Sequence, residues 1–304
     1  KELLGWSYEA ELDLENASKI YNENVNQAEK LGDKSVMARS LLKLGSIYDL
    51  QRNIEKGLDC ATRALDIFEE LGDKVGIAST QNALAWYYMD KNDFVSALDY
   101  FTRALEVQEE MDDKWQKRFT LRGLGVFYSM KGDYEKSLHY LTRSLKLREE
   151  LGDKWGMGNV LSGIGGIYAH KGDYDKALKF FDRSLKIRKN LGDKTRIAFN
   201  KISIGIVYYY KGDYEKVVEY FEQSISIQKE SVLGEDERYL GSSLETTAYL
   251  FISYKYLDRK YDVEKIHTLI EEAENIEFDL NLCLYELLGD KSYLETAYNQ
   301  VQEK

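Results

Sequence analysis

The chain repeats itself every 40 residues, and this period limits its fold more than any other feature. The tetrapeptide Leu-Gly-Asp-Lys occurs at 31–34, 71–74, 151–154 and 191–194, and Met111-Asp112-Asp113-Lys114 occupies the missing place. A fixed period of about 20 to 50 residues is typical of stacked supersecondary units that contact only their neighbours. Such a solenoid presents an extended surface to a partner more readily than it forms a catalytic pocket.

A second motif recurs in phase with the first and divides each repeat in two. It reads Lys-Gly-Asp-Tyr at 131–134, 171–174 and 211–214, Lys-Asn-Asp-Phe at 91–94 and Gln-Arg-Asn-Ile at 51–54. The segments between the motifs, such as 155–170 and 174–190, have apolar residues at helical spacing, which predicts two amphipathic helices per repeat. Gly ends one helix in the left-handed conformation and Asp caps the next. We therefore interpret the recurrent aspartates as helix caps: Asp33, Asp73, Asp153 and Asp193.

Small and aromatic residues alternate at fixed places in the two helices. The first helix carries Leu124-Gly125-x-x-Tyr128 or its equivalent, and the second carries Ser137, Leu141 and Ser144 or their equivalents. Small residues allow paired helices to approach closely, and the aromatic rings fill the space between successive pairs.

These motifs resemble those of the tetratricopeptide repeat family. The repeat here has 40 residues rather than the family's usual 34 or so and lacks the closing proline. The longer unit is similar to that of Pins/LGN-type cell-polarity adaptors. The resemblance covers residues 1–228 well and the remainder loosely. It implies an all-α, right-handed superhelical solenoid of antiparallel helix pairs.

The repeats predict the organisation of the chain along its length. We expect a truncated first repeat at 1–30, five regular repeats at 31–230, a divergent repeat at 231–276 and a partial repeat at 277–304. An insertion of seven residues near 230–238 breaks the period. The sequence opens within a helical motif at Leu4-Gly5, and a helix from Ser292 has an apolar face with nothing after it to cover it. We therefore expect a fragment of a larger protein, or self-association through exposed solenoid ends.

The composition of the chain limits the classes of partner and the compartment that we expect. The net charge of −11 argues against nucleic acid, since phosphate backbones are bound by Lys and Arg. No apolar run approaches the 18 or so residues of a membrane span, so we expect no membrane association. The isolated Cys60 and Cys283 argue against disulfides and favour a reducing, cytoplasmic compartment.

No motif for catalysis stands out, and we predict a non-enzymatic protein without cofactor or metal. The histidines His139, His170 and His267 lie in different repeats, and no nucleophile, base and orienting group recur together. Recurrent glutamate pairs such as Glu69-Glu70 are interpreted as a solvated face. An arginine ladder at 63, 103, 143 and 183 has either a structural role or forms a stripe for an acidic partner.

The resemblance implies that the first helix of each pair lines a concave groove. Apolar residues cluster there, which suits an adaptable peptide-binding surface. The predicted groove residues are Asn82, Trp86, Met89, Phe119, Arg122, Val126, Met130, Asn159, His170, Phe199, Ile206 and Tyr209. Phe119 and Phe199 have the alternative of packing on the preceding helix pair. The polar cluster Asn82, Arg122 and Asn159 suits a peptide main chain or an acidic side chain.

We therefore predict a protein–protein interaction module that binds a peptide or protein segment. Neither the Lys and Asn pattern of chaperone-tail clamps nor the Asn series of the polarity adaptors is present, so the partner of those relatives does not carry over. Two alternatives remain. One is a ligand-sensing regulatory domain, similar in plan to bacterial Rap-type receptors, that controls an output domain. The other is a self-assembling architectural scaffold.

Overall fold

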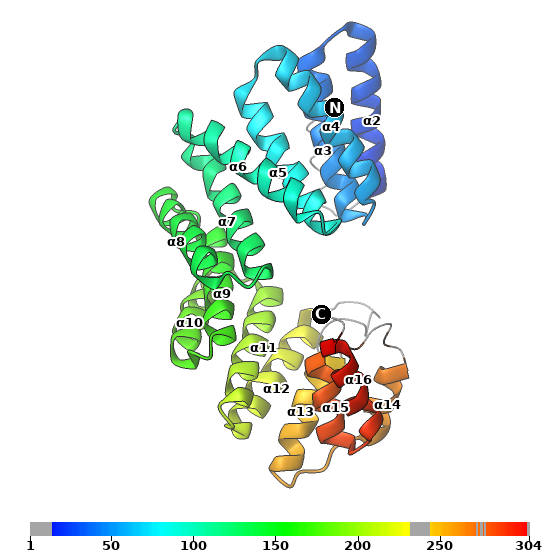
Figure 1. Cartoon of the computed structure of the whole chain (residues 1–304), viewed down its shortest axis with the longest axis vertical. Coiled ribbons are helices and arrows are strands. Elements are labelled where there is room, and N and C mark those ends of the chain that lie inside the picture. The colour runs from blue at the N-terminus through cyan, green and yellow to red at the C-terminus, as the bar shows by residue number, and fades with distance from the viewer. Residues whose placement is uncertain (1–13, 232–243, 272, 274–275, 277, 303–304) are drawn as a thin grey trace. The chain divides into compact units, whose positions relative to one another are not determined.

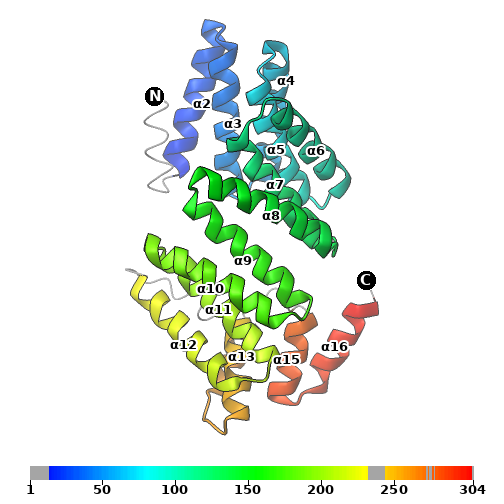
Figure 2. The ribbon, with the colours of Figure 1, turned by 90° about the vertical axis from the view of Figure 1, so that its left-hand side faces the viewer.

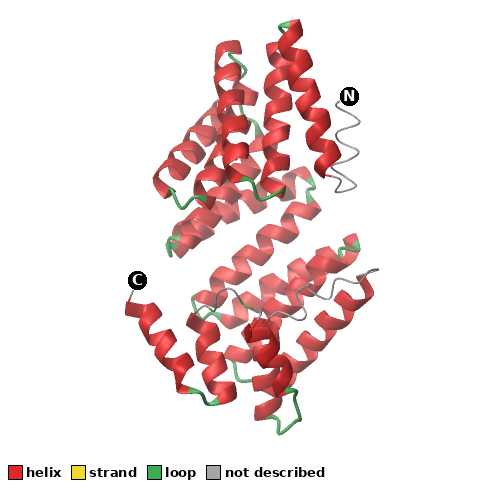
Figure 3. Ribbon diagram, turned by 90° about the vertical axis from the view of Figure 1, so that its right-hand side faces the viewer, coloured by secondary structure: helices red, strands yellow, loops and turns green. Residues whose placement is uncertain are grey.

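The computed structural model describes residues 14–231, 244–271, 273, 276 and 278–302, and every regular element in these residues is an α-helix (Figure 3). The chain divides into two compact units, Lys1–Gly152 and Asp153–Lys304. Each unit is a stack of antiparallel helix pairs, as the 40-residue period predicts.

Unit 1 contains the blue-to-green helices of Figure 1. Its N-terminal helix packs on the first of three pairs, α3/α4, α5/α6 and α7/α8, and each pair packs on the next. The bounds are α2 (Leu14–Leu31), α3 (Lys34–Leu50), α4 (Ile54–Leu71), α5 (Lys74–Asp90), α6 (Phe94–Glu110), α7 (Lys114–Met130) and α8 (Tyr134–Leu151).

Unit 2 begins with two more pairs, α9/α10 and α11/α12, which follow one another as layers in Figure 2. Four shorter helices come after them, and α13 packs on α12 and α15 while α15 packs on α16. The bounds are α9 (Lys154–His170), α10 (Tyr174–Leu191), α11 (Lys194–Tyr210), α12 (Tyr214–Ser231), α13 (Leu244–Tyr256), α14 (Val263–Glu271), α15 (Phe278–Leu288) and α16 (Lys291–Gln302).

The links between helices confirm the predicted capping chemistry. Asp33, Asp73, Asp153 and Asp193 each accept a hydrogen bond from the backbone N–H three residues later, at 2.8–3.1 Å. The glycine before each of them has a φ between 66° and 69°. These turns fix where each first helix begins, and hence which side chains share a face.

The turns within each pair follow the same rule with different residues. Asp133 and Asp173 cap the second helices, and Gly132 and Gly172 hold φ values of 73° and 75°. In the first two repeats Arg52 and Asn92 adopt the left-handed conformation instead, with φ values of 60° and 59°. A side chain with a Cβ atom is less stable in that conformation than glycine.

Close helix approach depends on the small residue of the Leu-Gly-x-x-Tyr motif. A Cβ atom added to Gly205 would lie 2.4 Å from the ring of Phe221 on the paired helix. Beside this contact, Tyr208 stacks on Tyr220 with ring centroids 5.6 Å apart, and Tyr128 stacks on Tyr140 in the same way at 5.5 Å. The predicted close approach of paired helices at the small residue is therefore present, whereas these aromatic rings stack within a pair and not, as predicted, between successive pairs.

The arginine ladder has intramolecular partners. The guanidinium of Arg103 lies 5.6 Å from the ring centre of Tyr100, and that of Arg183 lies 5.7 Å from that of Phe180. Arg143 pairs with Glu109 of the preceding repeat at 2.7 Å. These contacts favour the structural role over a stripe for an acidic partner.

The C-terminal region departs from the regular repeat. The expected insertion near 230–238 lies largely outside the described residues, as does the helical motif expected at Leu4-Gly5. On α16, Ala297 is buried while Leu294, Tyr298 and Val301 are exposed, so this helix keeps an apolar outer face.

Candidate binding face on the first helices

The first helix of each repeat presents one row of side chains with the spacing i, i+4, i+7 or i+8, i+11 or i+12, and i+15. On α7 the row contains Trp115, Phe119, Arg122, Val126 and Met130, and on α9 it contains Trp155, Asn159, Ser162, Gly166 and His170. This spacing places the members of a row on one side of a helix. The equivalent rows are Val75, Ser79, Asn82, Trp86 and Asp90 on α5, and Thr195, Phe199, Ile202, Ile206 and Tyr210 on α11. We call these four rows the first-helix face.

Contacts that the rows make with each other and with the residues beside them show that neighbouring first helices lie side by side within each unit. In unit 1, Gln116 of α7 donates to Ser79 of α5 at 2.7 Å, and Arg122 lies 5.5 Å from the ring centre of Trp86. In unit 2, Arg196 of α11 donates to Asn159 of α9 at 2.9 Å. Each unit therefore carries a continuous face made of side chains from consecutive repeats.

Large aromatic side chains remain open to solvent on this face. Trp115 is 59% exposed and Phe119 is 40% exposed, although both rings contact the guanidinium of the buried Arg118, at 3.6 and 4.1 Å. Trp155 and Phe199 occupy similar places in unit 2 and are exposed to 52% and 40%. Exposed aromatic rings held by packed neighbours are suited to anchoring a partner, because little side-chain entropy is lost on binding.

The predicted residues of unit 1 fall into three groups. Phe119 and Met130 are exposed, while Asn82, Trp86, Arg122 and Val126 are half-buried. Trp86 packs edge-on against Phe101, with ring centroids 5.6 Å apart. The prediction that Met89 lines the groove is wrong, because its side chain is only 4% exposed and packs in the core with Ala97 and Phe101. Successive side chains on a helix point about 100° apart, so the position after Met89 is the exposed one. Met130 occupies that position in the next repeat.

The predicted groove residues of unit 2 also differ in their exposure. His170 and Phe199 are exposed and Asn159 is half-buried. Ile206 and Tyr209 instead pack against the C-terminal helices, where the Tyr209 hydroxyl donates to Glu286 at 3.0 Å and its ring lies 4.7 Å from that of Tyr249. Burial and the nearby Cys283 and Glu286 raise the pKa of Tyr209. Ile206 and Tyr209 are therefore covered by the chain itself.

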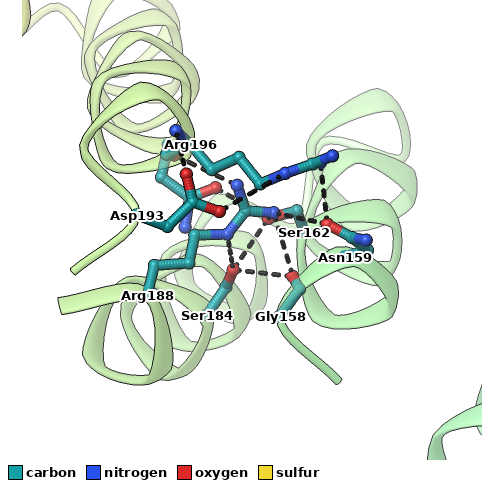
Figure 4. A network of polar contacts seen from close by, with 8 residues as sticks. Gly158, Asn159, Ser162, Ser184, Arg188, Asp193 and Arg196 are labelled. Carbon is teal, nitrogen blue, oxygen red and sulfur yellow. Dashed lines mark hydrogen bonds and ion pairs between the residues drawn. The ribbon is translucent and has the colours of Figure 1, made fainter. Parts of the chain in front are cut away.

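A polar network lies under the unit 2 face (Figure 4). Arg188 of α10 is only 5% exposed, and its guanidinium donates to Ser184 at 3.0 Å, to the Arg196 carbonyl at 3.1 Å and to Gly158, Asn159 and Ser162 at 3.3 Å each. Burial, followed by the neighbouring Arg196, lowers the pKa of Arg188 to about 10.

Sequence reasoning did not identify Arg188, Arg196 or the exposed Trp115 and Trp155. The tryptophans share one position of the 40-residue period with Val75, one helical turn before Phe119 and Asn159, so the period contained that signal. The sequence contains no such signal for Arg188, because an arginine in an amphipathic helix is expected at the surface.

Two kinds of site find no support in the residues that the structure describes. Groups of three or more His, Cys, Asp or Glu side chains placed to hold a metal ion are absent from them. Among these same residues, none of the helices has the length and apolar character to cross a membrane.

Comparison with known proteins agrees with this architecture. A profile described as tetratricopeptide repeat matches residues 36–110 and 156–230. The apo form of RapI is 20% identical, with a TM-score of 0.66 and a match that covers 90% of this chain and 98% of RapI. A Rap protein complexed with competence and sporulation factor is 16% identical, with a TM-score of 0.67 and coverage of 94% and 77%.

BtubC from P. vanneervenii is 19% identical, with a TM-score of 0.64 and coverage of 75% of this chain and 96% of that one. A comparison with curated proteins finds no match. At these identities the structural likenesses show the fold alone. The matched profile, the period and the stacked helix pairs together identify the chain as a tetratricopeptide repeat protein.

Proposed function

We propose that this chain is a non-enzymatic, cytoplasmic binding module that holds a peptide or protein segment along its first-helix face. Solved structures with the same fold include a Rap protein in complex with competence and sporulation factor, which supports binding of a partner of this kind. The resemblance of the 40-residue unit to Pins/LGN-type adaptors stays a prediction.

One observation carries the proposal. Within the regular helix pairs, and leaving out the last residue of each helix, the large apolar side chains that are exposed lie on first helices, namely Val75, Trp115, Phe119, Trp155 and Phe199, with Val95 as the exception. The second helices instead expose charged residues such as Lys146 and Lys186. Exposed apolar groups gathered on one face of a protein mark an interaction surface.

The test begins with selection of binders from a displayed library of random twelve-residue peptides. The binders are then titrated against Trp115→Ala/Phe119→Ala and Trp155→Ala/Phe199→Ala. We expect at least one of these variants to lose about tenfold or more in affinity, because buried aromatic anchors dominate such interfaces. Val95→Ala is the matched control, since it removes an exposed apolar group from a second helix. Equal binding by all three variants contradicts the proposal.

A second candidate is a ligand-sensing regulatory domain. It is favoured by the match to RapI, which extends over 90% of this chain and 98% of RapI. A sensor requires that binding change the stability of residues outside the contact surface. Hydrogen exchange of α13 and α16 with and without a selected peptide distinguishes the two. Slowed exchange there supports the sensor, and changes confined to the first-helix face support a passive binding module.

Self-association is a third candidate, and the apolar outer face of α16 favours it. Leu294, Tyr298 and Val301 are all exposed on this helix. Light scattering across a range of protein concentrations tests it, with Tyr298→Lys/Val301→Lys as the variant that should reduce the mean mass. A mass independent of concentration in the unmodified protein excludes the architectural role.

A further inference from the structure

We infer that the unit 2 part of the first-helix face binds an acidic side chain of its peptide partner at Arg196, Asn159 and Arg188. This inference rests on the proposed function and adds the chemistry of the residue that is recognised.

Two guanidinium groups converge on one neutral oxygen. The Oδ1 atom of Asn159 accepts from Arg196 Nη1 at 2.9 Å and from Arg188 Nη2 at 3.3 Å (Figure 4). The favoured partner of paired guanidinium groups is a carboxylate, which accepts shorter and stronger hydrogen bonds than an amide. Asn159 Oδ1 therefore marks the place where a carboxylate oxygen fits.

The charges drawn in Figure 4 do not balance. Arg188 and Arg196 are both cationic, and Asp193 is the carboxylate that the network contains. Asp193 lies 3.4 Å from Nε of Arg196 and also caps α11 by accepting from the Arg196 backbone N–H at 3.1 Å. The network keeps one excess positive charge in a chain with a net charge of −11. A ligand carboxylate would neutralise this charge.

The site can be reached from the first-helix face. Arg188 is almost fully buried, but the side chain of Arg196 is 41% exposed. The ring of Trp155 lies 4.7 Å from the Arg196 guanidinium and is itself half-exposed. A peptide anchored on Trp155 and Phe199 thus brings an Asp or Glu side chain to Arg196 first. Rotation of the Asn159 carboxamide then opens the Nη2 group of Arg188.

Unit 1 supplies the substitutions for the test. Positions 80 residues earlier, two repeats away, carry Gln108 in place of Arg188 and Gln116 in place of Arg196. The variant Arg188→Gln/Arg196→Gln therefore introduces residues that this fold already holds at equivalent places. Arg196→Gln alone changes a partly exposed side chain and provides a second variant in which folding is not at issue. Lys179→Gln/Lys186→Gln removes the same charge from exposed positions of α10.

The experiment selects peptides on the unmodified protein from a library whose C-termini are fused to the display protein, so that any selected carboxylate is a side chain. We expect one peptide position to be enriched in Asp or Glu. The best binder is synthesised with an amidated C-terminus and a fluorophore, together with its Asp→Asn or Glu→Gln partner. Affinities follow from fluorescence anisotropy at about 0.15 M salt, because ionic strength screens such pairs.

The neutral peptide should bind the unmodified protein and the lysine control about tenfold more weakly than the acidic one. For both arginine variants the two peptides should differ by less than about threefold, because the charged partner is lost. A difference that persists in the arginine variants places the carboxylate elsewhere and overturns the inference. Selected peptides without acidic enrichment that still depend on Trp155 and Phe199 overturn it while the proposed function stands. Failure to select any peptide overturns both.

Discussion

Two helix pairs, α5/α6 of unit 1 and α9/α10 of unit 2, solve the same packing problem differently at one buried position near the end of the second helix. In unit 2 this position is Arg188, whose guanidinium has acceptors in Ser184, Ser162 and the Gly158 carbonyl. In unit 1 the position 80 residues earlier is Gln108, which is 1% exposed and has no hydrogen-bond partner for either amide atom among the described residues. Ala104 stands there in place of Ser184.

The other repeats extend the comparison. Phe68 occupies this position in the first pair, and its ring lies within 2.5 Å of where Gly76 would carry a Cβ atom. Arg148 occupies it in the third pair and again donates to a serine, Ser144, at 3.3 Å. Arg148 and Arg188 thus each have a serine one helical turn earlier, whereas Phe68 has Ala64 there. Burial of a charge or an amide is stable only where the surrounding positions supply acceptors.

The largest expected effect comes from moving the charge to the helix pair α5/α6, which lacks the serine acceptor. Gln108→Arg places a guanidinium in a pair where Ala104 stands instead of the serine that accepts from Arg188, and we expect it to destabilise unit 1 by about 3 to 5 kcal/mol because the buried charge lacks this acceptor. Urea denaturation followed by circular dichroism measures the loss.

The control for that substitution adds the missing acceptor. Gln108→Arg/Ala104→Ser should recover about 1 kcal/mol of the lost stability, which is the usual net value of one hydrogen bond. An unchanged stability of the single variant would mean that solvent reaches position 108 and that the two helix pairs do not differ in the way described.

The comparison also shows what the sequence can and cannot predict. The caps at Asp33 and Asp193 and the helix pairs follow from local chemistry that recurs along the regular repeats, and these were predicted. The prediction for Met89 was wrong because a shift of one residue along a helix turns a side chain from the exposed face into the core. Arg188 was missed because its burial depends on Ser162 and Gly158 of another helix, which are distant in sequence. Tyr209 and Ile206 were predicted on an open face because no pattern in the sequence shows that α13 and α15 pack over them.

A smaller effect is expected from removing the unpartnered amide. Gln108→Met keeps a similar volume and should stabilise unit 1 by about 1 to 2 kcal/mol, because the cost of burying unbonded polar atoms disappears. Arg188→Met should have the opposite sign and cost about 1 to 3 kcal/mol, because it leaves the Gly158 carbonyl and the serine hydroxyls with fewer partners. Thermal melts of the two variants measure both changes. The same sign for both would show that the side chain's hydrogen bonds do not decide stability at this position.

The smallest effect concerns the turns, where the units also differ. Unit 2 has glycine at the left-handed position of both turns within its pairs, Gly172 and Gly212, each with a φ of 75°. Unit 1 has Arg52 there in its first pair, with a φ of 60°. Arg52→Gly relieves the contact between Cβ and the following carbonyl, which costs an L-residue about 1 to 2 kcal/mol in this conformation.

The greater freedom of glycine in the unfolded chain offsets part of that gain, so we expect a net stabilisation of about 0.5 to 1 kcal/mol. Because each repeat contacts only its neighbours, the gain should appear as slower hydrogen exchange in α3 and α4 and should leave α9 to α12 unchanged. Asn92→Gly is the matched comparison and should gain less, because asparagine tolerates the left-handed conformation better than arginine does. An equal gain for both would indicate that the unfolded chain, rather than strain in the turn, sets the difference between the units.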